Sequence, residues 1–128
     1  MTVFEDARGM GVIAASDLAR ARSFYEGVLG LEPVEEQPEE ESVIYRLGGV
    51  PLLVYKSGYA GTAQNTVFAM ESDDLARDMA ALRERGVTFM EYDFPGLKTV
   101  DGVAELPSER SSWFADSEGN ILALTQRT

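Results

Sequence analysis

Three side chains suited to acid–base chemistry lie close together in the sequence: Tyr92, Asp93 and Lys98. A lysine or aspartate that is removed from water in an apolar cavity can have a pKa near neutrality, as general acid–base catalysis requires. The same residues on an exposed loop would perform no chemistry, and we favour that interpretation. The chain contains no histidine and no cysteine, which excludes Ser-His-Asp and Cys-His catalysis and thiolate metal sites.

Carboxylates are the remaining strong metal ligands in this composition. Asp93, Asp101, Glu105 and Asp116 are available, and a site built only from carboxylates would favour Mg²⁺ or Ca²⁺. No ligand spacing links these four residues. The acidic run 35–41 contains a proline and no apolar residue, which is typical of a solvated connection between a helix and a strand. We therefore predict no metal site and no cofactor.

The charge balance limits the partners of the protein. Asp and Glu number 22 against 11 Lys and Arg, for a net charge of −11. Such a surface repels nucleic acid phosphates and anionic lipids, so we expect neither nucleic acid nor membrane as a partner. The longest strongly apolar run, 50–55, is far shorter than the roughly 18 residues that span a bilayer. The absence of cysteine and of a signal-like start favours a cytoplasmic location.

Two stretches of the chain resemble each other. Residues 11–20 and 67–77 both run from a short apolar segment into Asp-Leu-Ala-Arg, and each continues with apolar residues at helical spacing. Each helix is followed by one more apolar segment and by a predicted β-hairpin. We therefore expect a single domain, 1–128, built from two strand–helix–strand–strand–strand modules, at about 8–57 and 65–127.

The ends of the two predicted helices carry recognisable signals. Ser16 and either Ser72 or Asp73 are suited to cap their amino-terminal ends. Gly30 and Gly86 stand where a glycine would end each helix.

The predicted hairpins have different turns. Segments 43–47 and 50–56 flank Gly48-Gly49, and segments 112–115 and 121–126 flank Asp-Ser-Glu-Gly-Asn. One further segment, 91–110, has no counterpart in the first module. It is a surface excursion or a functional loop, with a strand around 98–106.

These motifs together resemble a known family. The stretch GVIAASDLARARSFYEGVLGLEPV at 11–34 and the stretch WFADSEGNILAL at 113–124 are similar to the vicinal oxygen chelate superfamily, also called the glyoxalase/bleomycin-resistance/dioxygenase family. The resemblance implies an α+β fold of two βαβββ modules, whose eight strands form a half-open barrel with the helices on its convex side. It also implies a ligand cavity on the concave side, and homodimers are frequent in the family.

The resemblance also places the metal ligands of the family's enzymes. The first-strand ligands correspond to Met10 and Val67, and the last-strand ligands correspond to Leu53 and Ala123. None of these side chains coordinates a hard divalent cation. A shift of the alignment by one residue would place Gly9 or Thr66 there, which are no better. The sequence therefore resembles a family member without the usual metal ligands.

Strand alternation extends these positions to a candidate ligand cavity. Its wall is apolar with aromatic edges, which suits a planar or aromatic ligand. Alternation leaves open whether Trp113 or Phe114 reaches the cavity. The candidate ligand-binding residues are Met10, Arg46, Leu53, Tyr55, Val67, Ala69, Tyr92, Asp93, Lys98, Trp113 and Ala123.

Two functions follow as hypotheses. The first is a metal-free protein, active as a homodimer, that binds a small aromatic or amphipathic molecule. The alternative is a small-molecule enzyme, lyase, isomerase or dioxygenase-like, that is metal-independent or uses a relocated metal site. No residue is assigned a catalytic role.

Overall fold

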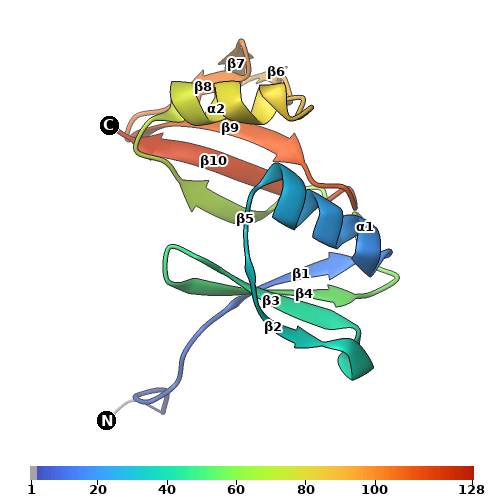
Figure 1. The fold of residues 1–128 in the computed structure, drawn as a ribbon. Coiled ribbons are helices and arrows are strands. Elements are labelled where there is room, and N and C mark those ends of the chain that lie inside the picture. Colours follow the sequence, from blue (N-terminus) through green and yellow to red (C-terminus); the bar gives the residue numbers. More distant parts are fainter. Residues whose placement is uncertain (1–2) are drawn as a thin grey trace.

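The computed structural model describes residues 3–128, which form two β-sheets placed one above the other with helices packed on them (Figure 1). The first sheet has the strand order β1-β4-β3-β2 and the second has the order β5-β10-β9-β8-β7-β6. The strands of the first sheet are β1 (Gly11–Ala15), β2 (Pro33–Gln37), β3 (Ser42–Leu47) and β4 (Val50–Lys56). Those of the second are β5 (Thr66–Glu71), β6 (Asp93–Phe94), β7 (Leu97–Val100), β8 (Val103–Glu105), β9 (Glu109–Ala115) and β10 (Ile121–Arg127).

The predicted α+β class is confirmed, but the strand count differs. The structure has two sheets of four and six strands where the resemblance implied a single eight-stranded half-open barrel. Segment 91–110 adds three strands, β6, β7 and β8, whereas the apolar segment 87–90 after the second helix forms only an isolated bridge between Phe89 and Phe114. A strand around 98–106 was expected there, and β7 and β8 form a hairpin over that stretch. Among residues 3–128, no helix is both long and apolar enough to cross a membrane.

Both helices begin at an aspartate. Helix α1 (Leu18–Arg22) continues as a π-helix over Ser23–Val28, and helix α2 spans Leu75–Glu84. Asp17 accepts the backbone N–H of Arg20, and Asp74 accepts that of Arg77. The caps predicted at Ser16 and at Ser72 or Asp73 are therefore wrong by one or two residues, because an aspartate follows each of them and satisfies the first turn instead.

The helices end as the sequence indicates. Gly30 and Gly86 follow the last helical turns with φ of +74° and +91°, a conformation that side-chain-bearing residues rarely adopt. Gly48 and Gly49 also have positive φ, as the tight turn between β3 and β4 requires.

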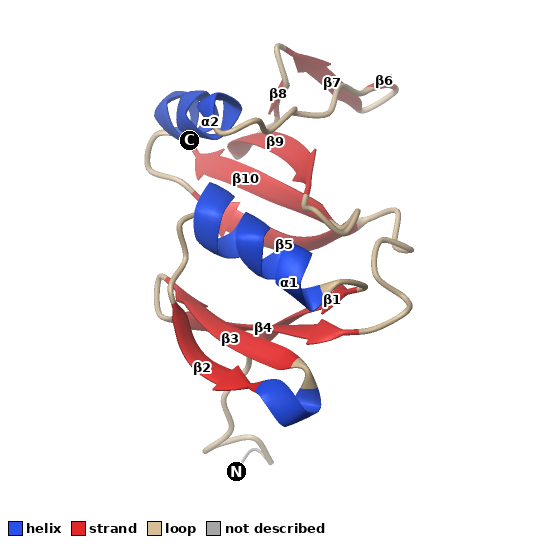
Figure 2. Cartoon of the chain, turned by 45° about the vertical axis from the view of Figure 1, so that its right-hand side comes forward, coloured by secondary structure: helices blue, strands red, loops and turns tan. Residues whose placement is uncertain are grey.

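The hydrophobic core spans both modules. Helix α1 lies along the seam between the two sheets, as Figures 1 and 2 both show. Phe24, in the π-helical turn, packs against Phe114 of β9 with ring centroids 6.5 Å apart, and Phe89 packs against the same ring at 5.5 Å. The two modules therefore share a core. We call the other side of each sheet, away from this core, its open face.

The turn between β9 and β10 ties the modules together. Asp116 is buried, and its Oδ1 accepts the backbone N–H groups of Glu118 and Asn120, at 2.8 and 2.9 Å. Its Oδ2 accepts the hydroxyl of Tyr25, from the first module, at 2.6 Å. The side chain of Asn120 donates to the carbonyl of Ala14 in β1 at 2.8 Å. The β9–β10 turn of the second module is thus hydrogen-bonded to side chain and backbone groups of the first module.

The acidic run 35–41 is more ordered than the sequence indicates. Glu35 and Glu36 lie in β2, and a 3₁₀ turn covers Pro38–Glu40. Arg22 of α1 pairs with Glu36 and also with Glu26. The run was predicted to be a solvated connection, but Glu35, Glu36 and Gln37 extend the first sheet as an edge strand paired with β3, while Glu35 and Glu36 stay exposed.

Candidate functional site

The open face of the second sheet is defined by strand register. Trp113 of β9, Ala123 of β10 and Ala69 of β5 lie side by side on three neighbouring strands. Phe114 and Leu122 face the other way and are fully buried in the core. Because successive side chains alternate across a strand, Trp113 lies on the open face. The choice between Trp113 and Phe114, which the sequence left undecided, is thereby made.

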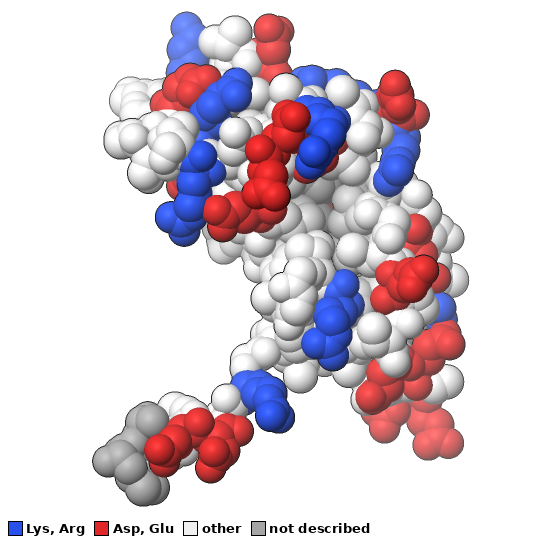
Figure 3. Space-filling view, turned by 60° about the vertical axis from the view of Figure 1, so that its left-hand side comes forward, with Lys and Arg blue, Asp and Glu red and all other residues white. Residues whose placement is uncertain are grey.

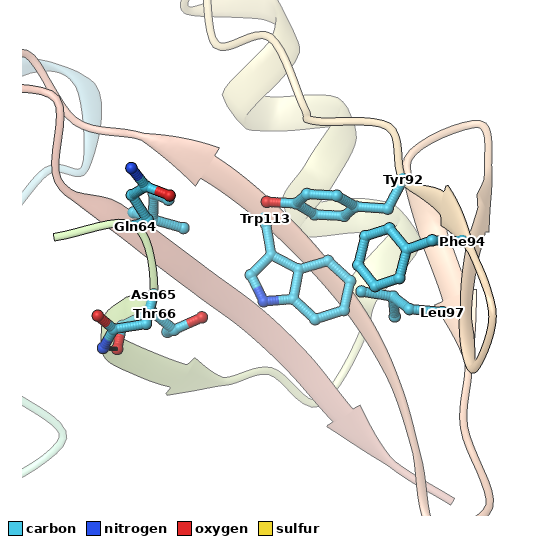
Figure 4. A pocket seen from close by; sticks show the side chains of 8 residues that line it. Gln64, Asn65, Thr66, Tyr92, Phe94, Leu97 and Trp113 are labelled. Carbon is cyan, nitrogen blue, oxygen red and sulfur yellow. Dashed lines mark hydrogen bonds between the residues drawn. The ribbon is translucent and has the colours of Figure 1, made fainter.

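A cleft of about 340 Å³ opens beside Trp113 (Figure 4). One wall is aromatic: Tyr92 meets the indole edge-on with ring centroids 5.5 Å apart, and Phe94 meets Tyr92 at 5.9 Å. The opposite side is polar. We call this cavity the aromatic cleft, and its lining consists of Gln64, Asn65, Thr66, Tyr92, Phe94, Leu97, Trp113 and Ile121.

Backbone hydrogen bonds hold the aromatic wall in place. The N–H of Met90 donates to the carbonyl of Trp113 at 2.8 Å, which fixes the segment before Tyr92 against β9. The N–H of Tyr92 donates to the hydroxyl of Thr99 at 2.8 Å, and the N–H of Thr99 donates to the carbonyl of Tyr92 at 2.9 Å. The tight turn at Gly96, with φ of +86°, then brings Phe94 back over the sheet. The wall is therefore formed before any ligand binds.

The polar side of the cleft comes from the segment that leads into β5. Thr66 lies opposite Ile121, whereas Phe68 lies opposite the next residue, Leu122. Val67 is therefore an extra residue, a β-bulge that turns its side chain against the core. The bulge leaves Thr66, and not Val67, at the cleft.

The structure brings some of the predicted site residues together and separates others. Tyr92 and Trp113 line the aromatic cleft, with Ala123 and Ala69 beside Trp113 on the same open face. On the first sheet, Leu53 of β4 lies opposite Val12 of β1 and is half-buried.

The remaining apolar and basic candidates lie outside the cleft. Tyr55 and Arg46 are exposed strand residues of β4 and β3. Met10 precedes β1 and is 50% exposed.

The candidate acid–base group is not assembled in the cleft. Asp93 and Lys98 face each other across the β6–β7 hairpin, and both are exposed. The hydroxyl of Tyr92 donates to Met90 Sδ at 3.1 Å and not to either of them. Lys98 borders a different depression, together with Val100, Asp101, Val103, Glu105 and Arg110.

Sequence reasoning missed Phe94 and Leu97 as site residues. They flank Pro95-Gly96, a pair that favours a tight turn, and that turn carries both side chains to the cleft. A hairpin prediction over 92–99 would have identified them. Gln64 and Asn65 carry no comparable signal, since they lie in an irregular connection.

The family's metal site does not fit the residues present. Leu53 and Ala123 stand on the open faces of their sheets, but neither has a donor atom, and Val67 is turned into the core. Met10 offers a thioether, a soft donor. Among residues 3–128, no group of three or more His, Cys, Asp or Glu residues could hold a metal ion. No reaction step can be derived through a metal at these positions.

Charged side chains lie around the open side of the molecule and not within the cleft. Figure 3 shows a hollowed side lined mainly by uncharged side chains, with acidic and basic side chains gathered above and below it. The lining of the aromatic cleft contains no charged residue. Such a cavity favours the uncharged, apolar part of a ligand.

The two sheets meet at their edge strands β1 and β5. Helix α1 lies on one side of the sheets (Figure 2), and the aromatic cleft opens on the other, as in the glyoxalase type of fold. The chain belongs to the Glyoxalase/Bleomycin resistance protein/Dioxygenase superfamily, whose family model matches residues 9–124. No curated protein sequence matches the chain significantly.

Solved structures share this fold at low sequence identity. UcmS2 is 17% identical, with a TM-score of 0.71 over 92% of this chain and 97% of that one. TnmS3, an antibiotic binding protein from Streptomyces sp. CB03234, is 22% identical, with a TM-score of 0.67 over 96% and 98%. Lactoylglutathione lyase from Agrobacterium tumefaciens is 18% identical, with a TM-score of 0.67 over 94% and 93%. Relatives of one fold thus include both a binding protein and an enzyme, so fold alone does not choose between them.

Proposed function

We propose that this protein binds a small planar molecule, aromatic or amphipathic, in the aromatic cleft and does so without a bound metal ion. The observation that carries the proposal is the preformed wall of Trp113, Tyr92 and Phe94 around an uncharged cavity. Aromatic side chains arranged in this way offer both ring faces and ring edges to a planar ligand. TnmS3, which shares this fold, is an antibiotic binding protein, and this supports the same class of function.

The cleft supports binding better than catalysis. On the side opposite the aromatic wall, its polar groups are two amides and a hydroxyl, from Gln64, Asn65 and Thr66. These groups can orient a ligand by hydrogen bonds, but none of them titrates near neutral pH. Asp93 and Lys98, the residues on which an enzymatic alternative would depend, lie outside the cleft.

The single tryptophan provides a direct test. Anthracene-9-methanol, an uncharged planar probe, should quench the fluorescence of Trp113 saturably, because the indole lines the cleft. Tyr92→Ala should weaken this binding about fivefold, since an aromatic contact contributes about 0.5–1.5 kcal/mol. Tyr59→Ala is the matched control: Tyr59 is 81% exposed and does not line the cleft. Equal affinities of the two variants, or no saturable quenching, would refute the proposal.

We also propose that the protein is a homodimer. The open side exposes several apolar residues: Met10, Val12 and Tyr55 are each between 38% and 52% exposed. An apolar patch of this kind, beside unpaired strand edges, favours association of two copies. Sedimentation at micromolar concentration should give a species of twice 14.0 kDa, and a monomer alone would contradict this. A cytoplasmic location remains a prediction of the composition.

A further inference from the structure

The aromatic wall of the cleft carries two polar groups, and one of them is already engaged within the protein. The hydroxyl of Tyr92 donates to Sδ of Met90 at 3.1 Å. The other group is the indole Nε1–H of Trp113, which donates to no acceptor within residues 3–128. Phe94, the third ring of the wall, has no polar atom. The wall therefore offers a free hydrogen-bond donor.

This donor is accessible from the aromatic cleft. Trp113 is half-buried, and within residues 3–128 no side-chain nitrogen is both buried and without a partner, so Nε1 must be accessible to solvent. The indole lines the cleft. Figure 4 shows its nitrogen on the side of the ring toward Thr66 and Asn65 and away from Phe94. A molecule that fills the cleft between the aromatic wall and Thr66 therefore covers this N–H.

Covering a free N–H group sets a requirement on the ligand. An N–H that is open to solvent donates to water. A ligand that displaces this water without offering an acceptor leaves the donor unpaired, which is unfavourable, whereas an acceptor at the same place restores the hydrogen bond. The cleft thus discriminates between two molecules of the same shape that differ only in an acceptor beside Nε1.

The charges of the protein indicate which kind of acceptor this is. The lining contains no cation that could balance a carboxylate or a phenolate, and a net charge of −11 repels anions. A neutral carbonyl oxygen meets the requirement. It accepts a hydrogen bond near the plane of its own ring system, so the faces of a planar ligand remain free to contact the aromatic side chains.

Building on the proposed function, we propose that the ligand is an uncharged planar aromatic carbonyl compound, such as a ring ketone or a lactam, whose carbonyl oxygen accepts the Nε1–H of Trp113. Trp113 is then a residue that determines specificity. The rings of the aromatic wall contribute affinity for any planar body, and the indole N–H selects a body that carries an acceptor.

Two probes of similar shape test this. 9-Fluorenone and 9H-fluorene are planar, uncharged, three-ring molecules, and only the ketone carries an acceptor. Their affinities can be measured by displacement of anthracene-9-methanol, followed through the fluorescence anisotropy of that probe. Trp113→Phe keeps an aromatic ring and removes the N–H. The ratio of the fluorenone affinity to the fluorene affinity should fall about fivefold in this variant, the factor for one neutral hydrogen bond.

A control variant and a second measurement sharpen the test. Tyr59→Phe removes a polar hydrogen from an exposed ring outside the cleft and should leave the ratio within about twofold of wild type. The chain has a single tryptophan, so wild-type protein gives one indole N–H resonance in a ¹H–¹⁵N spectrum. Fluorenone should shift this proton further downfield than fluorene does, because a hydrogen bond to a carbonyl deshields it.

The outcomes separate the inference from the proposed function. An unchanged affinity ratio in Trp113→Phe, or an equal shift of the indole proton with both probes, would overturn the role of Nε1 and leave binding in the cleft intact. An equal fall of the ratio in Tyr59→Phe would also overturn it, because the selectivity would then not arise in the cleft. Failure of fluorenone, fluorene and anthracene-9-methanol alike to bind would count against the proposed function itself.

Discussion

Oε1 of Glu118 accepts the backbone N–H of Asp17 at 2.9 Å. A side chain from the second module thus caps helix α1 of the first module. The same oxygen accepts the hydroxyl of Ser16 at 3.0 Å, and Oε2 accepts Nε of Arg20 at 2.8 Å. The Glu118 side chain has no exposed surface. The hydrogen bond from Arg20, followed by those from Asp17, Ser117 and Ser16, lowers the pKa of Glu118 to about 2 against the opposing effect of burial.

The first prediction follows from that pKa. A carboxylate whose pKa is lower in the folded than in the unfolded chain stabilises the fold above the unfolded pKa, and this contribution is lost as the pH falls. The window for Glu118 is therefore from about pH 4.5 down to about pH 2. Glu118→Gln should lower the free energy of unfolding at pH 7 by about 2 kcal/mol. Urea denaturation should show this difference shrinking through that window.

A matched variant identifies the source of the effect. Glu39→Gln removes an exposed carboxylate that forms no ion pair within residues 3–128, and the free energy of unfolding of this variant at pH 7 should equal that of wild type. A pH-independent deficit in Glu118→Gln would mean that packing, and not the ionised carboxylate, supplies the stability.

The second prediction concerns the seam where β1 meets β5. A Cβ atom at Gly11 would lie 2.8 Å from Cε1 of Phe68 and 3.0 Å from Cδ1 of Leu52. Gly11→Ala should therefore force the phenyl ring away and lower the free energy of unfolding by about 1–3 kcal/mol. Gly9→Ala has no atom within 4 Å of the added Cβ and should be neutral. Similar denaturation midpoints for the two variants would show that the seam is not tightly packed.

The third prediction concerns metal ions. The four positions of the family's ligands hold Met10, Leu53, Val67 and Ala123, which offer no hard donor. Elemental analysis of the purified protein should find no stoichiometric divalent ion. Addition of Mg²⁺, Mn²⁺, Ni²⁺ or Zn²⁺ should leave the thermal midpoint unchanged, because a ligand that binds only the folded state would raise it. One metal ion per chain would overturn the assignment of these four positions.

Local signals in the sequence predicted much of the fold. Gly48-Gly49 between two apolar runs indicated the β3–β4 hairpin, and Gly30 and Gly86 indicated the helix ends, because each needs a backbone conformation that glycine adopts readily. The caps were misplaced because Ser16 and Asp17 are both good capping residues. What decided between them is a long-range contact, since Ser16 is bonded to Glu118.

The candidate site was less predictable because it also depends on contacts between residues that lie far apart in the sequence. A bulge at Val67 shifts the register between β5 and β10, and strand alternation cannot anticipate an unpaired residue. The bulge therefore brings Thr66 to the cleft in place of Val67. The aromatic wall depends on how segment 91–99 folds over β9, which is a tertiary arrangement. Trp113 and Tyr92, which the sequence analysis predicted as ligand-binding residues, both line the cleft, and their role in binding stays a prediction.

The last prediction separates the aromatic cleft from the packed sheet beside it. Thr66 is exposed and lines the cleft, whereas Ala123 is 7% exposed between Ala69 and Trp113. Thr66→Phe should fill the cleft and abolish binding of anthracene-9-methanol, and it should change the free energy of unfolding by no more than about 0.5 kcal/mol, as expected for a surface site. Ala123→Trp should overpack its surroundings and cost about 1–3 kcal/mol. Calorimetric titration with the probe and urea denaturation of both variants measure the two effects. If Thr66→Phe is destabilised as much as Ala123→Trp, the cleft is filled by protein in solution, and a ligand site there is ruled out.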